Sequence, residues 1–350
     1  MENIIKYINN YSGKIIYVTS SVYNTMLAVS ILLQTDKKPE SIIIMTTPHK
    51  DEVKQFTSIS TRMEYEKINN IVIDKKTRVH RAIGISSVSN NIIKKRVYQI
   101  LDTSKHNFLL VNFSWAQKKV AYPASIYLDE CEKAIFIQEG VMQYVTPDDN
   151  NFYLLLKKLY GNQTNFWTMD KIEGIYVTDP EKFPNYLHPK LIKANFNYCE
   201  NQADIISKIF LSEEERKELS ELKTADGIIF TQPLSEDGFI SEKEKTNIYL
   251  KIKTVCDQYG KFVIKLHPRD TSDYDIDKSL LISGKYPSEI FKLNHIKFKY
   301  AVGICTSAIA TIDADHAFNI NENFLFDKKI NFEDIDLKLK AIQYKNHGKI

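Results

Sequence analysis

The 350-residue sequence contains few cysteines and few glycines, and both scarcities exclude classes of protein. The four cysteines (Cys131, Cys199, Cys256 and Cys305) are widely spaced without a C-x-x-C pair, so neither a zinc ribbon nor a disulfide framework is indicated. The 11 glycines form neither G-x-G-x-x-G nor G-x-x-x-x-G-K-[ST], which leaves a dinucleotide-type or P-loop site without support. A reducing cytoplasm fits this composition best, and any nucleotide must be held by another device.

A strong charge imbalance and long apolar runs are also absent. Lys plus Arg (47) exceed Asp plus Glu (44) by only three, so nucleic acid is not the expected partner. The amino terminus has no apolar core of a signal peptide. The longest early apolar run, from Met26 to Leu33, is far shorter than the roughly 20 residues that span a bilayer. The sequence predicts a cytoplasmic protein, and it leaves peripheral contact with the inner membrane open.

Short runs rich in Ile and Val alternate with amphipathic stretches along most of the chain. KIIYVTS, SIIIMTT, HNFLLVNFS and KAIFIQEG belong to the first half, and ADGIIFTQPL, KFVIKLHPR and YAVGICTS continue the series in the second. Such alternation is typical of parallel α/β sheets. We predict two Rossmann-like domains, residues 1–173 and 223–350, joined by a linker and connecting segment at 174–222. Two such domains facing each other across a cleft form the GT-B layout.

Polar residues follow many of the predicted strands, and open α/β sheets bind their ligands at those ends. In the first half they are Ser20, Ser21, Asn112, Ser114 and the run Gln138, Glu139, Gly140; in the second they are Thr231, Gln232, the run Lys265 to Arg269, Thr306 and Ser307. Each of them alone is compatible with a cap or a turn. Their joint occurrence at strand ends in both halves favours a ligand site.

Three of these strand ends resemble the signatures of bacterial sialyltransferases with the GT-B fold. IQEGVMQY matches an acidic residue followed by Gly, KLHPR matches an HP dipeptide, and GICTSA matches a Ser/Thr pair. The polysialyltransferases share this scheme. IYVTSSVYNTMLA and FTQPLSEDG resemble glycosyltransferase family 52, the lipooligosaccharide and capsule sialyltransferases. The motifs run in order from Ile15 to Asp313. Gln138 departs from a pair of acids, and Cys305 to Ser307 stand where two serines are common.

The resemblance implies an inverting sialyltransferase that moves sialic acid from CMP-Neu5Ac to a hydroxyl of a terminal sugar, with galactose expected, on a lipooligosaccharide or capsule glycan. Glu139 matches the catalytic base, and His267 matches the histidine that assists the departure of CMP. The remaining donor contacts implied are Lys265, Pro268, Arg269, Glu289, Thr306, Ser307, Thr231 and Gln232. The expected acceptor or sugar contacts are Ser20, Ser21, Asn112, Ser114 and Gly140.

Several of these residues also have an ordinary structural interpretation. Glu289 is equally well explained as a first-turn acid favoured by a helix dipole, and Lys265 and Arg269 as solvated charges. A basic cluster at Lys75, Lys76, Arg78, His80 and Arg81 is either a solvated face or an attractor of an anionic glycan or phosphorylated lipid.

We expect no metal cofactor. Asp-x-Asp pairs occur within Asp273 to Asp277, at Asp313/Asp315 and at Asp334/Asp336, and none of them follows a predicted strand of the amino-terminal half. A monophosphate leaving group also needs less charge neutralisation than a diphosphate.

Three alternatives to a single-transfer sialyltransferase stay open. A polysialyltransferase would need an extended basic groove, which the near-neutral charge disfavours. A UDP-sugar epimerase or another GT-B enzyme would share the layout, and the epimerase would need no acceptor. A non-catalytic glycan-binding or nucleotide-binding subunit would lack the base or the acid, whereas Glu139 and His267 are both present. The sequence does not disclose the oligomeric state.

Overall fold

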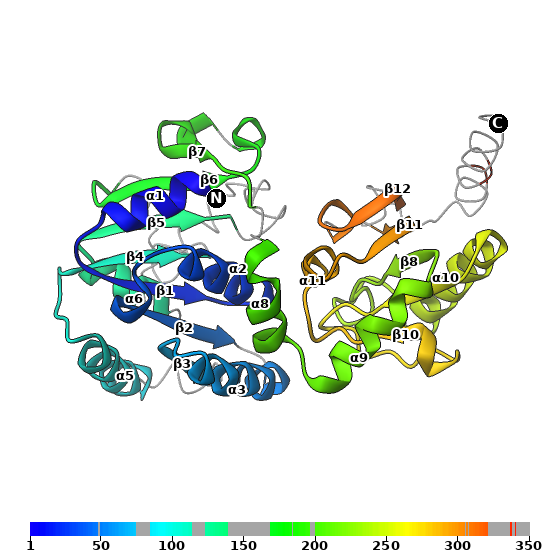
Figure 1. Cartoon of the computed structure of the whole chain (residues 1–350), viewed down its shortest axis with the longest axis horizontal. Coiled ribbons are helices and arrows are strands. Elements are labelled where there is room, and N and C mark those ends of the chain that lie inside the picture. The colour runs from blue at the N-terminus through cyan, green and yellow to red at the C-terminus, as the bar shows by residue number, and fades with distance from the viewer. Residues whose placement is uncertain are drawn as a thin grey trace. The chain divides into compact units, whose positions relative to one another are not determined.

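The computed structural model describes residues 1–47, 50–74, 85–113, 123–138, 169–183, 185–196, 200–304, 306 and 308–320, with positions 337 and 340. The chain divides into two compact units, Met1–Phe210 and Leu211–Ile350. Each unit is built on its own sheet (Figure 1).

The first unit contains a seven-stranded sheet in the order β3-β2-β1-β4-β5-β6-β7. Every neighbouring pair of these strands is parallel. The strands are β1 (Lys14–Thr19), β2 (Ser41–Thr47), β3 (Asn70–Asp74), β4 (Phe108–Asn112), β5 (Lys133–Ile137), β6 (Ile172–Val177) and β7 (Leu191–Lys193). Their carboxyl ends therefore lie at one edge of the sheet.

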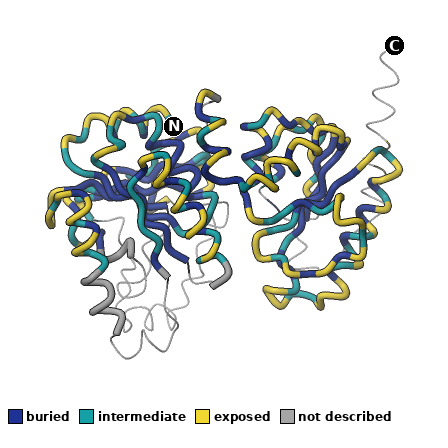
Figure 2. The backbone as a smooth tube through the Cα atoms, turned by 60° about the horizontal axis from the view of Figure 1, so that its bottom comes forward, coloured by how far each residue is buried: buried dark blue, intermediate teal, exposed yellow. Residues whose placement is uncertain are grey.

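Helices cover both faces of this sheet, as expected for a parallel sheet. They are α1 (Glu2–Asn10), α2 (Val22–Leu33), α3 (Lys50–Tyr65), α5 (Ile85–Leu101), α6 (Pro123–Glu130) and α8 (Ala203–Phe210). On one face Ile16 packs in a core cluster with Val97 of α5 and Leu128 of α6. Ile15 and Tyr17 alternate to the opposite face and are equally buried. Figure 2 shows the buried strands at the centre.

The second unit contains a five-stranded parallel sheet in the order β10-β9-β8-β11-β12. The strands are β8 (Gly227–Phe230), β9 (Phe262–Lys265), β10 (Leu281–Ile282), β11 (Lys297–Ile304) and β12 (Asp313–Ile320), and the helices are α9 (Glu213–Glu221), α10 (Glu242–Cys256) and α11 (Glu289–Leu293). Tyr249 and Ile252 of α10 pack in one core cluster with Ile229 and Ile264 of the sheet. This face of the sheet is thereby closed by α10.

The predicted class, two α/β units with parallel sheets, is confirmed. Part of the segment 174–222, predicted as a linker, belongs to the first unit. The end of β6 and all of β7 extend the first sheet beyond β5, and α8 packs against α2 and α3. For this reason the division falls between Phe210 and Leu211. The predicted cleft concerns the relative placement of the units and stays a prediction.

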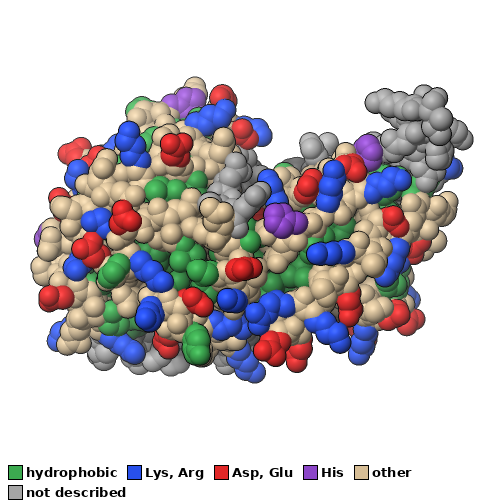
Figure 3. Space-filling model, in the orientation of Figure 1, with side chains coloured by type: hydrophobic (Ala, Val, Ile, Leu, Met, Phe, Trp, Pro, Cys, Tyr) green, Lys and Arg blue, Asp and Glu red, His purple; other side chains and the backbone are tan. Residues whose placement is uncertain are grey.

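The surface mixes both signs of charge. On the face shown in Figure 3, acidic and basic side chains are interspersed over both units, in line with the near-neutral net charge. None of the helices in the described ranges combines the length and apolar character needed to cross a bilayer.

Candidate functional site

The structure brings together two of the predicted donor-site residues, Thr231 and His267, at the carboxyl edge of the second sheet. Thr231 directly follows β8, and His267 lies two residues after the end of the adjacent strand β9. The Thr231 N–H donates to the Lys265 carbonyl oxygen (3.0 Å), and the His267 N–H donates to Thr231 Oγ1 (2.9 Å). The side-chain hydroxyl of Thr231 thus adds a hydrogen bond beyond the last backbone pair of the two strands. It fixes the start of the turn that contains His267 and Pro268, called the HP turn below.

The imidazole of His267 is half-buried and has a defined hydrogen-bond partner. Its Nδ1 accepts from the backbone N–H of Arg269 (3.1 Å), so the neutral ring carries its hydrogen on Nε2. Burial, together with the nearby Arg269 charge, lowers the pKa of His267 to about 4, against the opposing effect of Asp270. At neutral pH the ring is therefore a neutral hydrogen-bond donor.

The side chain of Arg269, predicted to meet the donor, is engaged by a carboxylate. Its Nη1 and Nη2 lie 2.5 and 3.0 Å from Oδ1 and Oδ2 of Asp237, a bidentate pair. Pro268 and Arg269 are both exposed. The pair ties the HP turn to the loop that follows β8.

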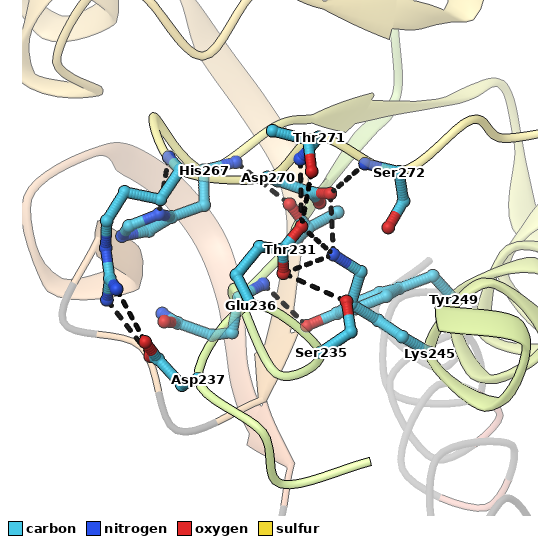
Figure 4. A network of polar contacts seen from close by, with 12 residues as sticks. Thr231, Ser235, Glu236, Asp237, Lys245, Tyr249, His267, Asp270, Thr271 and Ser272 are labelled. Atoms are coloured by element: carbon cyan, nitrogen blue, oxygen red, sulfur yellow. Dashed lines mark hydrogen bonds and ion pairs between the residues drawn. The ribbon is translucent and has the colours of Figure 1, made fainter. Parts of the chain in front are cut away.

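A buried lysine lies beneath the same two loops (Figure 4). Lys245 of α10 has no exposed surface, and its Nζ is 2.7 Å from Glu236 Oε2 and 2.7 Å from Asp270 Oδ1. One turn further along α10, the Tyr249 hydroxyl accepts from the Gln232 N–H (2.8 Å). Helix α10 therefore anchors both loops from one side.

Lys265, the last residue of β9, lies inside the unit on the other side of the sheet. Because Phe262 and Ile264 face the α10 side, Lys265 alternates to the opposite face. Its Nζ donates to the carbonyl oxygens of Ser283 and Tyr286. With only 4% of its surface exposed, it is unsuited to direct contact with a donor in this conformation.

The turn after β10 approaches the HP turn closely. A Cβ at Gly284 would lie 2.6 Å from the His267 carbonyl oxygen, so a larger residue would displace one of the two turns. The adjacent Ser283 N–H donates to Glu218 Oε1 (2.9 Å), and burial raises the pKa of this carboxyl group. The main chain of His267 is therefore confined by the side chain of Thr231 and by the turn at Gly284.

Glu289 and Thr306, the other described donor-site candidates, have local partners. Glu289 is the first residue of α11, and burial raises the pKa of its carboxyl group. The Thr306 N–H donates to Asn319 Oδ1 (3.1 Å), and Thr306 Oγ1 accepts from the Ala308 N–H (3.3 Å). Both contacts of Thr306 order the turn after β11. The binding roles of both residues stay predictions.

In the first unit, the described acceptor candidates surround the start of α2. Ser21 is its N-cap, with Oγ accepting from the Asn24 N–H (3.2 Å), and Ser20 Oγ accepts from Asn24 Nδ2 (3.4 Å). Asn112, at the end of the adjacent strand β4, is completely buried, which argues against direct contact with a sugar in this conformation.

The chain leading to the predicted base is held firmly. Gln138 Oε1 accepts from the Thr178 N–H (2.8 Å) and hydroxyl (3.1 Å), and the Gln138 N–H donates to the Tyr176 carbonyl (3.0 Å). Gln138 thus ties the end of β5 to the end of β6. The other predicted residues of this half, together with Ser307, lie outside the described residues; they are Glu139, Gly140, Ser114 and the basic cluster Lys75, Lys76, Arg78, His80 and Arg81.

Among the described residues, no group of three or more His, Cys, Asp and Glu side chains has a metal-binding arrangement. The expectation of a metal-independent reaction concerns chemistry that this finding does not test, and it stays a prediction.

Sequence reasoning missed the residues that join the two loops: Glu236, Asp237, Lys245 and Asp270. One signal in the sequence identifies Lys245. Tyr249, Ile252 and Cys256 follow it at helical spacings of four, seven and eleven residues and form the buried stripe of α10. A lysine on that stripe must have an internal partner.

A family model agrees with the part of the residue-level resemblance that lies in the second half of the chain. Residues 168–321 match the model of glycosyltransferase family 52, and this range contains Thr231, His267 and Glu289. An uncharacterized protein of Haemophilus influenzae is 29% identical over 190 residues, covering 52% of this chain and 60% of that protein. The structure of UDP-GlcNAc 2-epimerase from Methanocaldococcus jannaschii aligns over 95% of this chain and 99% of that chain, with 11% identity and a TM-score of 0.43. Over residues 168–321 the chain is therefore similar to glycosyltransferase family 52.

Proposed function

We propose that the protein is an inverting sialyltransferase that transfers sialic acid from CMP-Neu5Ac to a hydroxyl of a terminal sugar, with galactose as the first candidate. The acceptor is a lipooligosaccharide or capsule glycan. One observation carries the proposal: within the family 52 region, the histidine of the HP turn is held as a neutral Nε2–H donor at the carboxyl edge of a parallel sheet.

The state of His267 fits the departure of CMP. As the bond from the anomeric carbon to the phosphate oxygen breaks, CMP leaves with the electron pair and negative charge grows on that oxygen. A fixed Nε2–H in a partly desolvated position stabilises this charge. Because the pKa of His267 is about 4, the ring acts at neutral pH as a hydrogen-bond donor, and it need not deliver a full proton.

Glu139 completes the proposed reaction as the base. Its carboxylate takes the proton of the acceptor hydroxyl while the hydroxyl oxygen forms a bond to the anomeric carbon, on the face opposite CMP. The products are the sialylated glycan with inverted configuration and CMP. Support for Glu139 comes from the IQEG motif and from the anchored Gln138 directly before it.

The partners follow from this reaction. They are CMP-sialic acid and an oligosaccharide or glycolipid acceptor, without nucleic acid. A cytoplasmic location, with peripheral contact at the inner membrane, would give the enzyme access to nascent glycolipids and forms part of the proposal.

CMP release from CMP-Neu5Ac tests the function. Purified protein is assayed in EDTA with and without acceptors that end in galactose or in sialic acid. We expect acceptor-stimulated release that survives EDTA. His267→Ala should lower the rate on the order of 100-fold or more through lost stabilisation of the leaving group, and Glu139→Ala should lower it by a comparable factor.

The chain supplies a matched control in its second HP dipeptide. His188 precedes Pro189 in the first unit, and its Nε2 lies 2.9 Å from the Phe183 carbonyl oxygen. His188→Ala should leave the rate of transfer unchanged. Absence of release with every acceptor, or equal rates in all three variants, would overturn the proposed function; turnover of a UDP-sugar without an acceptor would replace it.

A further inference from the structure

The ammonium group of Lys245 joins two loops that carry the candidate donor site. Nζ lies 2.8 and 2.7 Å from the two carboxylate oxygens of Glu236, in the loop after β8. It also lies 2.7 Å from Oδ1 of Asp270, in the loop after β9. In Figure 4 the lysine rises from α10 to meet both carboxylates. A single charge therefore links the Thr231 loop with the His267 loop.

Both carboxylates are themselves fixed by the loops. Glu236 Oε1 accepts from the Thr271 N–H (2.9 Å), so a residue of the first loop holds the main chain of the second. Asp270 accepts from the Ser272 N–H (3.0 Å) and the Tyr274 hydroxyl (2.9 Å). The hydrogen bonds of Glu236, together with its contact to the Lys245 ammonium, hold the pKa of its carboxyl group at about 2 although burial opposes this. Glu236 is therefore ionised at neutral pH, and hydrogen-bond donors surround both carboxyl groups.

Stability alone gives a poor reason for this arrangement. Replacement of a buried ion pair by apolar residues of similar volume is often neutral or stabilising. The residues of α10 that are buried in the core cluster of the sheet are apolar or aromatic: Tyr249, Ile252 and Cys256. A methionine at position 245 would continue the stripe that they form. The charge occurs at the level of the two loops, where it can fix their conformation.

We propose that Lys245 is a positioning residue, which fixes the loops after β8 and β9 against each other and thereby sets the orientation of the His267 imidazole. The main chain transmits this effect. Asp270, held by Lys245, donates its N–H to the His267 carbonyl oxygen (2.9 Å), and the intervening Arg269 N–H donates to His267 Nδ1. The consequence for catalysis rests on the proposed function, whereas the effect on the imidazole does not.

The first test observes the imidazole directly in the full chain. Nitrogen-15 NMR of labelled histidine reports the tautomer and the pKa of each ring, and loss of a signal in His267→Ala assigns it. In the parent protein we expect one neutral tautomer, with hydrogen on Nε2. Lys245→Met should produce a mixture of tautomers and raise the pKa of His267 toward the ordinary value, whereas Lys245→Arg should restore much of the parent spectrum.

Lys253→Met is the matched control. Lys253 lies on the same helix, is nearly as buried, and pairs with Asp257 at 2.6 Å, outside the two loops. Its replacement should leave the His267 signals unchanged. If Lys245→Met does not fold, Glu236→Gln serves in its place, since it removes one carboxylate charge with little change in shape. Unchanged His267 signals in the folded variant overturn the proposal.

Kinetics test the catalytic consequence. Lys245→Met should lower kcat on the order of 10- to 100-fold through misplacement of a catalytic group, with a small change in KM for the donor. Combined with His267→Ala it should cause little further loss, because both changes disable the same group. Fully additive losses overturn the positioning role. Absence of transfer in the parent protein would refute the proposed function, and the NMR result would still decide the role of Lys245.

Discussion

Lys265 lies at the end of a strand, where an anion ligand is expected, but its side chain bonds to groups inside the second unit. Its Nζ donates to the Tyr286 carbonyl oxygen (3.0 Å) and lies 4.4 Å from the centre of the Tyr286 ring. Burial lowers the pKa of the amino group to about 7, against the opposing charge of Glu218. Near neutral pH the folded protein therefore holds a mixture of charged and uncharged Lys265.

This shift predicts an unusual dependence of stability on pH. Between about pH 7 and pH 10.5 the unfolded chain keeps the proton of Lys265 and the folded chain releases it. The free energy of unfolding should then rise with pH, by up to about 1.4 kcal/mol per pH unit from this group. Lys265→Met removes the contribution, so any advantage of the variant over the parent should shrink from pH 7 to pH 10. Urea unfolding at several pH values measures the difference.

The control for Lys265→Met is Lys253→Met, in which a different buried lysine is lost. The stability difference between this control and the parent should not show the same trend with pH. Parallel stability curves for the parent and Lys265→Met between pH 7 and pH 10 would show that Lys265 keeps its proton in the folded state.

At the residue scale, position after a strand identified residues that lie together, whereas charge type did not indicate whether a residue is buried. The sequence singled out Thr231 and His267, and the structure places them in contact. Lys265 was grouped with them as a donor ligand, yet the last position of a central strand is buried on both faces, so its amino group meets carbonyl oxygens. Glu236 and Asp270 were not singled out, because their partner lies on a helix and only the fold brings the three together.

Two helices of the second unit begin with capping boxes, and one of them supports the candidate site. Ser212 and Glu215 cap α9, and Ser241 and Glu244 cap α10. The Lys245 N–H donates to the Ser241 carbonyl oxygen (3.0 Å), so the cap lies one turn before the buried lysine. The beginning of α10 thereby determines the position from which Lys245 contacts the loops after β8 and β9.

Loss of the α10 cap should affect both stability and the site. Ser241→Ala is expected to cost about 0.5–2 kcal/mol of unfolding free energy. Fraying of the first turn should also broaden the NMR signals of His267 through Lys245. Ser212→Ala should cost a similar amount in α9 and leave these signals sharp, since α9 does not carry the network. Equal spectra for the two variants would contradict the link between the cap and the site.

At the element scale, periodicity located central strands of the second unit and its helix α10. The amphipathic stretch between ADGIIFTQPL and KFVIKLHPR forms α10, Glu242–Cys256, followed by a 3₁₀ turn at Asp257–Tyr259. Short edge strands were harder to predict. β7 has only the three residues Leu191–Lys193, too few for alternation to be visible, and Pro-containing segments flank it.

At the scale of the whole molecule, local patterns predicted two units, and the division between Phe210 and Leu211 falls within the predicted connecting segment 174–222. Alternation of strands and helices shows how many sheets a chain can build. It does not show that α8 packs on α2 and α3, a contact between segments roughly 140 to 180 residues apart in sequence. Each unit has its own apolar core, around Ile16 in the first and around Ile264 in the second. Each is therefore expected to unfold as a cooperative transition of its own.

The proposed donor site lies in the second unit, so ligand binding should distinguish the two transitions. Leu27→Ala in α2 and Ile264→Ala in β9 remove fully buried side chains and should each lower one calorimetric transition, which assigns it. Saturating CMP should raise the temperature of the transition assigned by Ile264→Ala. At a CMP concentration of 100 times the dissociation constant, the free energy of unfolding of that unit should increase by about 2.7 kcal/mol. The transition assigned by Leu27→Ala should move far less. UMP at the same concentration is the matched ligand control and should have a smaller effect. A CMP shift confined to the first unit would place the nucleotide away from His267 and remove the basis for its role at the phosphate.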